Sequence, residues 1–145
     1  MPIVFENPNY AGFKELASKR LHEAKCLLAA GHFSGAYYLG GYIVEMALKA
    51  CYCKNVKEGS FPPEKKVYDN LYSHNLNKLL EASGAKLSYD QKITVSQKFA
   101  LNWNVVKDWD AKSRYCVIDE SSAMDIISAV DDVDDGVFNW IQTLW

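Results

Sequence analysis

The sequence lacks the features that would assign it to a common functional class. No apolar run approaches the roughly 18–20 residues that a membrane-spanning helix needs. Residues 1–6 do not combine a charged start with an apolar stretch, so we expect no secretory signal and a cytoplasmic protein. The motifs G-x-x-x-x-G-K-S/T, G-x-G-x-x-G, H-E-x-x-H and G-x-S-x-G are all absent. The common nucleotide-binding loops, zinc proteases and serine hydrolases are therefore not expected.

Cysteine and arginine are scarce. The four cysteines are Cys26, Cys51, Cys53 and Cys116, and the C-x-C pair at 51–53 is too tight for a structural zinc site. We expect four free thiols that act as small buried hydrophobic side chains. Only two of the 16 basic residues are arginines, fewer than nucleic-acid-binding surfaces usually use.

The residues that are present are typical of one globular domain. The chain has 145 residues, of which 49% are apolar and 23% charged, which predicts a single domain over 1–145. Residues 1–116 carry a net charge of +5, whereas residues 117–145 carry seven acids and no lysine or arginine. This asymmetry either steers an anionic ligand to one face or lets the two parts neutralise each other within a monomer or dimer.

The hydrophobic periodicity is helical almost throughout. It predicts helices from Phe13 to about Gly31 and over 34–53, 75–82, 88–103 and 122–144. The segment 54–73 is one long loop with room for a short turn of helix, and residues 104–118 are less regular. We therefore expect an all-α, up-and-down bundle of four main helices plus one or two short ones.

The last predicted helix carries an acidic cluster, 131–135. We place Val133 and Val137 in its inward stripe, so the acids fall on the solvated face. They lack the glycine turn and the spacing of a calcium loop, and no metal site is predicted. Trp140 and Trp145 lie near the end of this helix and predict apolar surface for a partner, and hence a homodimer.

Two glycines interrupt the helix predicted over 34–53. Gly40 and Gly41 each cost roughly 1 kcal/mol relative to alanine in a helix interior. Such a pair indicates either close helix packing or the approach of a ligand to the backbone.

One side of the same helix carries a polar row. Tyr38, Tyr42, Glu45 and Lys49 follow one another at intervals of four, three and four residues and so share a face. Glu45 and Lys49 form an i,i+4 pair in the favourable orientation. The row either ties this helix to the segment 109–115 or faces a ligand.

Three segments carry a family resemblance. They are AAGHFSGAYYLGGYIVEMALKA at 29–50, SHNLNKLL at 73–80, and Asn102-Trp103 with Trp109 and Ser113-Arg114-Tyr115. In this order they resemble the second helix, the His-x-Leu-x-x-Leu helix and the Trp-to-Arg-Tyr region of HEPN (higher eukaryotes and prokaryotes nucleotide-binding) domains. The resemblance covers about residues 10–145.

The resemblance implies a homodimeric helical bundle of one of two kinds. Many HEPN domains are metal-independent endoribonucleases, often toxins, with an Arg-x(4–6)-His motif assembled across the dimer. Others are non-catalytic and bind nucleotides or pair with a small nucleotidyltransferase. Here positions 119–121 after Arg114 and 25–27 after Arg20 contain no histidine. Without it, proton transfer from the ribose 2′-hydroxyl lacks its usual agent.

We therefore predict a non-catalytic binding module for nucleotide or RNA, without cofactor, DNA or membrane partner. The candidate ligand-binding residues are Tyr42, Glu45, Lys49, Trp109, Arg114 and Tyr115. Arg114 would hold phosphate through its planar guanidinium, and Tyr42, Trp109 or Tyr115 would stack on a base. Alternatively, Arg114 forms an internal salt bridge with Glu45 or Asp110.

We retain two alternative functions. The chain could be an RNA-cleaving toxin that uses Arg114 and His74, which the resemblance places with Glu45 and Lys49 in one cleft between the helix at 34–53 and the segment 109–115. It could also be an interaction partner that neutralises, or is neutralised by, a nucleotidyltransferase in a toxin–antitoxin or defence system.

Overall fold

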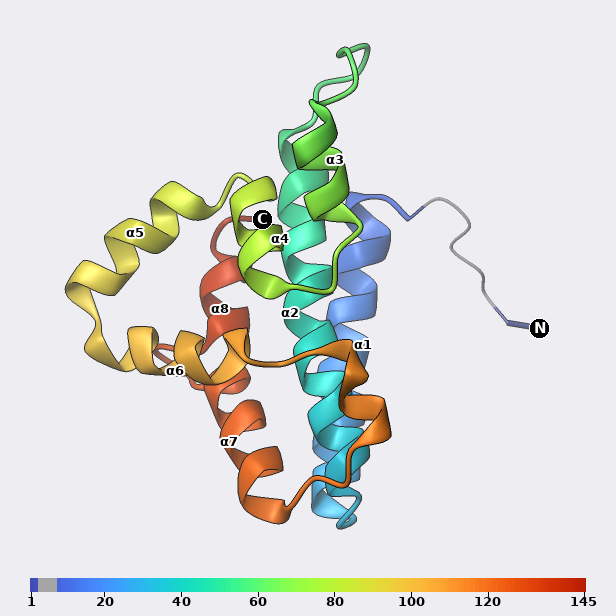
Figure 1. Cartoon of the computed structure of the whole chain (residues 1–145), viewed down its shortest axis with the longest axis vertical. Coiled ribbons are helices and arrows are strands. Elements are labelled where there is room, and N and C mark those ends of the chain that lie inside the picture. Colours follow the sequence, from blue (N-terminus) through green and yellow to red (C-terminus); the bar gives the residue numbers. More distant parts are fainter. Residues whose placement is uncertain (3–7) are drawn as a thin grey trace.

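The structure is a computed structural model that describes residues 1–2 and 8–145 (Figure 1). Its elements are α1 (Tyr10–Ala29), α2 (Phe33–Asn55), α3 (Lys65–Leu71), α4 (Leu76–Ala82), α5 (Lys86–Val95), α6 (Gln97–Lys107), the 3-10 helix η1 (Ala111–Tyr115), α7 (Glu120–Asp131) and α8 (Val137–Gln142). The predicted all-α helical bundle is confirmed. Of the N-terminal stretch 1–6 that was interpreted as lacking a secretory signal, residues 3–6 lie outside the described residues. None of the described helices has the length and apolar character needed to cross a membrane.

The antiparallel pair α1 and α2 forms the long axis of the molecule (Figure 1). Helix α1 begins at Asn9, whose side chain accepts a hydrogen bond from the Gly12 amide at 2.9 Å. It ends at Gly31, which has φ +80°. The His32 amide bonds back to the Leu27 carbonyl at 2.8 Å, the pattern of a Schellman motif. This compact end reverses the chain and sets α2 against α1.

Helix α2 is the centre of the core, because α1, α4, η1, α7 and α8 all contact it. Gly40 and Gly41 are buried and permit close packing, as one of the two alternatives predicted. A Cβ on Gly40 would lie 3.2 Å from Ile126 Cγ2 on α7, and a Cβ on Gly41 would lie 1.8 Å from Trp109 Cδ2. The pair therefore lets α7 and the Trp109 segment approach the backbone of α2.

The helix expected over 88–103 is interrupted, and this prediction was wrong in detail. Ser96 has extended dihedral angles and separates α5 from α6, which form a bent arm beside the core in Figure 1. Its hydroxyl accepts from the Phe99 amide at 3.0 Å and so caps α6. A serine that bonds the backbone locally competes with helix continuation.

The helix expected over 122–144 is also two helices. Asp132 accepts hydrogen bonds from the amides of Asp134 at 3.1 Å and Asp135 at 2.8 Å, which forms a turn between α7 and α8. This turn rotates Val133 outward, where it is 87% exposed. The prediction that Val133 points inward was therefore wrong, whereas Val137 is buried as expected.

The acidic cluster at 131–135 is held by lysines from three other helices. Lys25 on α1 pairs with Asp131 at 2.7 Å, Lys98 on α6 pairs with Asp132 at 2.6 Å, and Lys92 on α5 pairs with Asp135 at 3.4 Å. The basic body and the acidic last segment thus neutralise each other within one chain, as one of the two alternatives proposed.

The loop predicted over 54–73 is shorter than expected. Helix α2 extends to Asn55, and α3 occupies residues 65–71 of the predicted loop, so the long connection covers 56–64. The segment 104–118 contains the end of α6 and the whole of η1. The Ile118 amide donates to Ser34 Oγ at 2.9 Å, which fastens the end of this segment to the start of α2.

Two predictions about side-chain burial need correction. All four cysteines are free thiols, but Cys26 and Cys116 are exposed and only Cys51 is fully buried. Trp140 and Trp145 do not supply apolar surface for a partner. Trp140 is buried against Phe99, and Trp145 packs on Phe138 while its Nε1 donates to the Ala47 carbonyl at 3.3 Å.

Candidate functional site

The site is centred on the polar row of α2 and on the segment that leads into α4. Glu45 is only 3% exposed although it is ionisable. Its Oε1 lies 2.6 Å from Nδ1 of His74, and its Oε2 lies 3.8 Å from Nζ of Lys49. The structure therefore brings together three of the four residues that the sequence placed in one cleft.

The Glu45 contact orients His74. The contact is a hydrogen bond between Nδ1 of His74 and the carboxyl group of Glu45. The other ring nitrogen, Nε2, makes no hydrogen bond with any described group. The His74 side chain is 53% exposed. A buried carboxyl group thus holds an accessible imidazole in one orientation, an arrangement suited to proton transfer or to binding an anion.

Trp109 has a structural position. It is 2% exposed, lies on Gly41 and meets the Tyr42 ring edge-to-face with ring centroids 4.9 Å apart. Its Nε1 has no hydrogen-bond partner among the described residues. The expectation that Trp109 stacks on a base was therefore wrong, because neighbouring side chains cover its ring.

Arg114 lies on the exposed side of η1. Its guanidinium donates to the Ala111 carbonyl at 3.2 Å and its Cζ lies 4.7 Å from the centre of the Tyr115 ring. The nearby Tyr115 side chain, followed by that of Tyr38, raises the pKa of Arg114. The predicted salt bridge to Glu45 or Asp110 is absent, since no ion pair of the described residues includes Arg114.

Two tyrosines separate Arg114 from His74. The hydroxyls of Tyr38 and Tyr42 lie 3.4 Å apart, and the Tyr42 ring meets the His74 ring edge-to-face at 5.8 Å. Burial raises the pKa of Tyr42, as do the Tyr38 hydroxyl and the charge of Glu45, while the charge of Arg114 acts in the opposite direction. Tyr38 and Tyr42 thus form a continuous aromatic strip from Arg114 to the Glu45–His74 pair.

The polar row on α2 extends beyond Lys49, the last residue that the sequence analysis assigned to it. Lys49 also borders a pocket of about 490 Å³ in the neighbouring part of the molecule. Its lining residues are Pro8, Phe13, Lys49, Tyr52, Cys53, Leu71 and Tyr72. Tyr52 follows Lys49 by three residues, so the same helical spacing that defined the row could have identified it.

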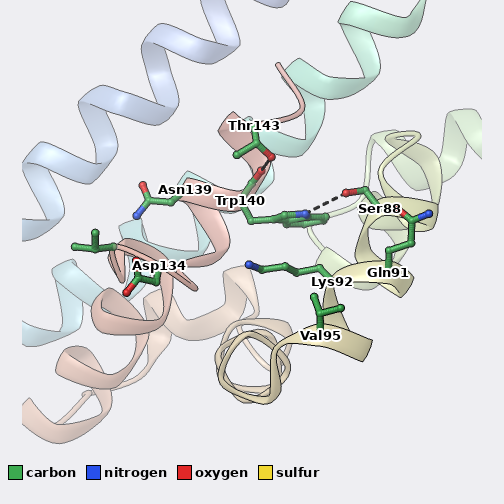
Figure 2. Close-up of a pocket in the computed structure, with 9 residues that line it drawn as sticks. Ser88, Gln91, Lys92, Val95, Asp134, Asn139, Trp140 and Thr143 are labelled. Carbon is green, nitrogen blue, oxygen red and sulfur yellow. Dashed lines mark hydrogen bonds between the residues drawn. The ribbon is translucent and has the colours of Figure 1, made fainter.

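A second pocket of about 440 Å³ lies between α5 and the turn that precedes α8. Figure 2 shows the Trp140 indole with Ser88 on one side, to which Nε1 donates at 3.2 Å. Lys92 also lines this pocket but pairs with Asp135. Because the charge of Lys92 is engaged in that ion pair, this pocket is less suited to bind an anion than the surface around Arg114.

The described part of the chain contains no group of three or more His, Cys, Asp or Glu side chains that could hold a metal ion. Comparisons with protein-family models, with curated proteins and with solved structures gave no match. The functional argument therefore depends on the chemistry of the side chains. These provide an exposed guanidinium, an aromatic strip and a carboxylate-oriented histidine, which together suit a ligand that is both anionic and aromatic.

Proposed function

We propose that this chain is a HEPN-type binding module that holds a phosphate of RNA or of a nucleotide on Arg114. The observation that carries the proposal is that the Arg114 guanidinium is exposed and has hydrogen-bond donors without a partner among the described residues. Arg114 is exposed and makes one hydrogen bond to a carbonyl, without an ion pair to any described carboxylate. The remaining donors of its planar fork suit a bidentate contact with phosphate.

The neighbouring residues have distinct roles in this proposal. Tyr115 is exposed and lies against the guanidinium, so it is the base-stacking residue. Glu45 is a positioning residue that holds His74, because it is too buried to meet a ligand directly. Trp109 supports Tyr42 from below the surface.

Binding of a fluorescent single-stranded RNA, followed by polarisation in metal-free buffer, tests the proposal. We expect Arg114→Gln to weaken binding about tenfold and to reduce the slope of log K against log salt by about 0.7, the value for one phosphate contact on a single strand. The chain offers a matched control in Arg20→Gln, because Arg20 is paired with Glu23 at 2.5 Å. Equal losses in both variants would contradict a specific role for Arg114.

The HEPN resemblance also supports a homodimer. With Trp140 and Trp145 engaged internally, the exposed apolar side chains that follow Arg114 in the sequence are Tyr115 and Val117. Light scattering at tens of micromolar should give twice the chain mass of 16.4 kDa. A mass of one chain at that concentration would contradict this part of the proposal.

A second candidate function is metal-independent RNA cleavage by His74 and Arg114. One observation favours it, namely the 2.6 Å contact that fixes the orientation of His74 and leaves Nε2 without a hydrogen bond to a described group. Against it, Tyr38 and Tyr42 lie between His74 and Arg114. We expect no cleavage when the protein is incubated with RNA and EDTA. Cleavage lost in both Arg114→Ala and His74→Ala would establish the enzyme instead.

A further inference from the structure

The pocket between α1, α2 and α3 has the composition of a site for an aromatic ligand. Three aromatic residues contribute to its walls, Phe13 from α1, Tyr52 from α2 and Tyr72 beyond the end of α3. Its volume of about 490 Å³ falls in the range of small-molecule sites, roughly 300–1,000 Å³. Figure 1 shows α3 beside the last turns of α2, with α1 on another side of α2.

Among the described residues, Lys49 is the only charged side chain that lines this pocket. Its side chain is 21% exposed, and its Nζ lies 3.8 Å from Glu45 Oε2, which is beyond hydrogen-bonding distance. No described group accepts a hydrogen bond from it. Its ion pair with Glu45 leaves the ammonium donors of Lys49 without a described hydrogen-bond acceptor, so they are available to an anionic oxygen that a ligand supplies.

Lys49 links the pocket to the Glu45–His74 pair. Lys49 and His74 contact the two oxygens of the same carboxylate, that of Glu45. Tyr72 precedes His74 by two residues in the connection from α3 to α4. A ligand with an aromatic ring in the pocket and an anionic group at Lys49 therefore comes close to His74 as well.

We propose that this pocket binds the base of a mononucleotide, whose phosphate contacts Lys49. The inference rests on the proposed function, because it identifies a nucleotide subsite at Lys49, which belongs to the polar row on α2. The aromatic walls suit a base irrespective of its sequence identity, since every base presents a π-face. The Glu45 carboxylate does not contribute attraction for phosphate, so Lys49 and the rings carry the affinity.

The test uses the whole chain with adenosine 5′-monophosphate in magnesium-free buffer, followed by calorimetry and by NMR signals of the tyrosine rings. We expect Lys49→Gln and Tyr52→Leu each to weaken binding about tenfold. Tyr72→Leu should also weaken it, and because Tyr72 is 72% exposed this variant keeps the fold intact. Lys66→Gln, an exposed lysine on α3 outside the pocket, is the matched control.

Two further ligands complete the test, one that lacks the nucleoside and one that lacks the phosphate. Inorganic phosphate and adenosine should each bind at least tenfold more weakly than the monophosphate. Equal binding of phosphate would overturn the base pocket, and equal binding of adenosine would overturn the role of Lys49.

The outcomes separate this inference from the proposed function. If RNA binding depends on Arg114 but the nucleotide leaves the Tyr52 and Tyr72 signals unchanged, the pocket is refuted and the binding module stands. If the nucleotide perturbs those rings and RNA binding ignores Arg114, the pocket stands and the Arg114 surface is refuted.

Discussion

The indole of Trp109 rests directly on the backbone of Gly41, so that a Cβ atom at position 41 would lie 1.8 Å from Trp109 Cδ2. Trp109 is buried in this position and also contacts Tyr42. The absence of a side chain at one helical position therefore decides where the segment before η1 meets α2. That segment leads to Arg114, so the glycine also places the proposed phosphate-binding residue.

Replacement of this glycine should be costly. We expect Gly41→Ala to lower the free energy of unfolding by about 1–3 kcal/mol or more, because the indole must move to make room. Chemical denaturation monitored by tryptophan fluorescence gives the value. Gly35→Ala, in the first turn of the same helix, is the control because its Cβ would meet only the end of the Leu27 side chain at 3.2 Å. A gain in stability for both variants would contradict the close packing of Trp109 on α2.

The sequence predicted the helical class and the importance of the glycine pair, because periodicity and helix propensity are local properties. It could not show which partner lay against each glycine. The same limit explains why the predicted base-stacking role of Trp109 is wrong, since tertiary contacts bury this side chain. Its burial depends on residues that are distant in sequence, such as Gly41 and Tyr42.

The helix breaks after α5 and α7 are signalled by local residues. The apolar periodicity continues across both breaks, however, and so predicts uninterrupted helices. Ser96 and Asp132 both accept hydrogen bonds from backbone amides and so end helical segments. In the candidate site, spacing placed Glu45 and Lys49 together on α2. The contact of His74 with Glu45 crosses 29 residues, and only the family resemblance suggested it.

The buried thiol of Cys51 should be inert in the folded protein. Burial raises its pKa to about 11, so almost no reactive thiolate is present at pH 8. Cys26 and Cys116 are exposed and should react rapidly with an aromatic disulfide reagent, whereas Cys51 should react only after denaturation. A Cys51→Ala variant should keep the amplitude of the fast phase, and loss of one thiol from that phase would contradict the prediction.

The ion pair between Lys98 and Asp132 should make stability depend on acidity. The hydrogen bond from Lys98, followed by the backbone amide of Asp135, lowers the pKa of Asp132. Because the unfolded carboxyl has a higher pKa, near 3.9, this contribution is complete above that value. It is lost as the pH falls through the lowered folded pKa.

We therefore expect Lys98→Gln to raise the pKa of Asp132 in an NMR titration. Its melting temperature should also fall less steeply than that of the unmodified chain between about pH 5 and pH 2. Lys66→Gln serves again as the control, because Lys66 has no ion pair among the described residues. Identical titration of Asp132 in both variants would show that the backbone amides alone set its pKa.

The contact between Glu45 and His74 should appear as an energetic coupling. Removal of His74 leaves a carboxylate that is 3% exposed with only Lys49 nearby, at 3.8 Å. A double-mutant cycle of Glu45→Gln and His74→Ala should therefore be non-additive by about 0.5–3 kcal/mol in the free energy of unfolding. The imidazole is half exposed, so its truncation removes little packing and the cycle isolates the polar contact.

A second cycle, of Glu45→Gln and Arg114→Gln, provides the comparison. Tyr38 and Tyr42 lie between these two residues, and no ion pair joins them. The coupling in this cycle should be smaller than in the first, because Glu45 and Arg114 share only Tyr42 as a neighbour and make no direct contact. Coupling of similar size in both cycles would mean that Arg114 and Glu45 belong to one network, and would move the phosphate site from the edge of the tyrosine strip to the Glu45–His74 pair. Additivity in both cycles would mean that Glu45 does not hold His74 in solution, which would remove the structural basis for proton transfer by this histidine.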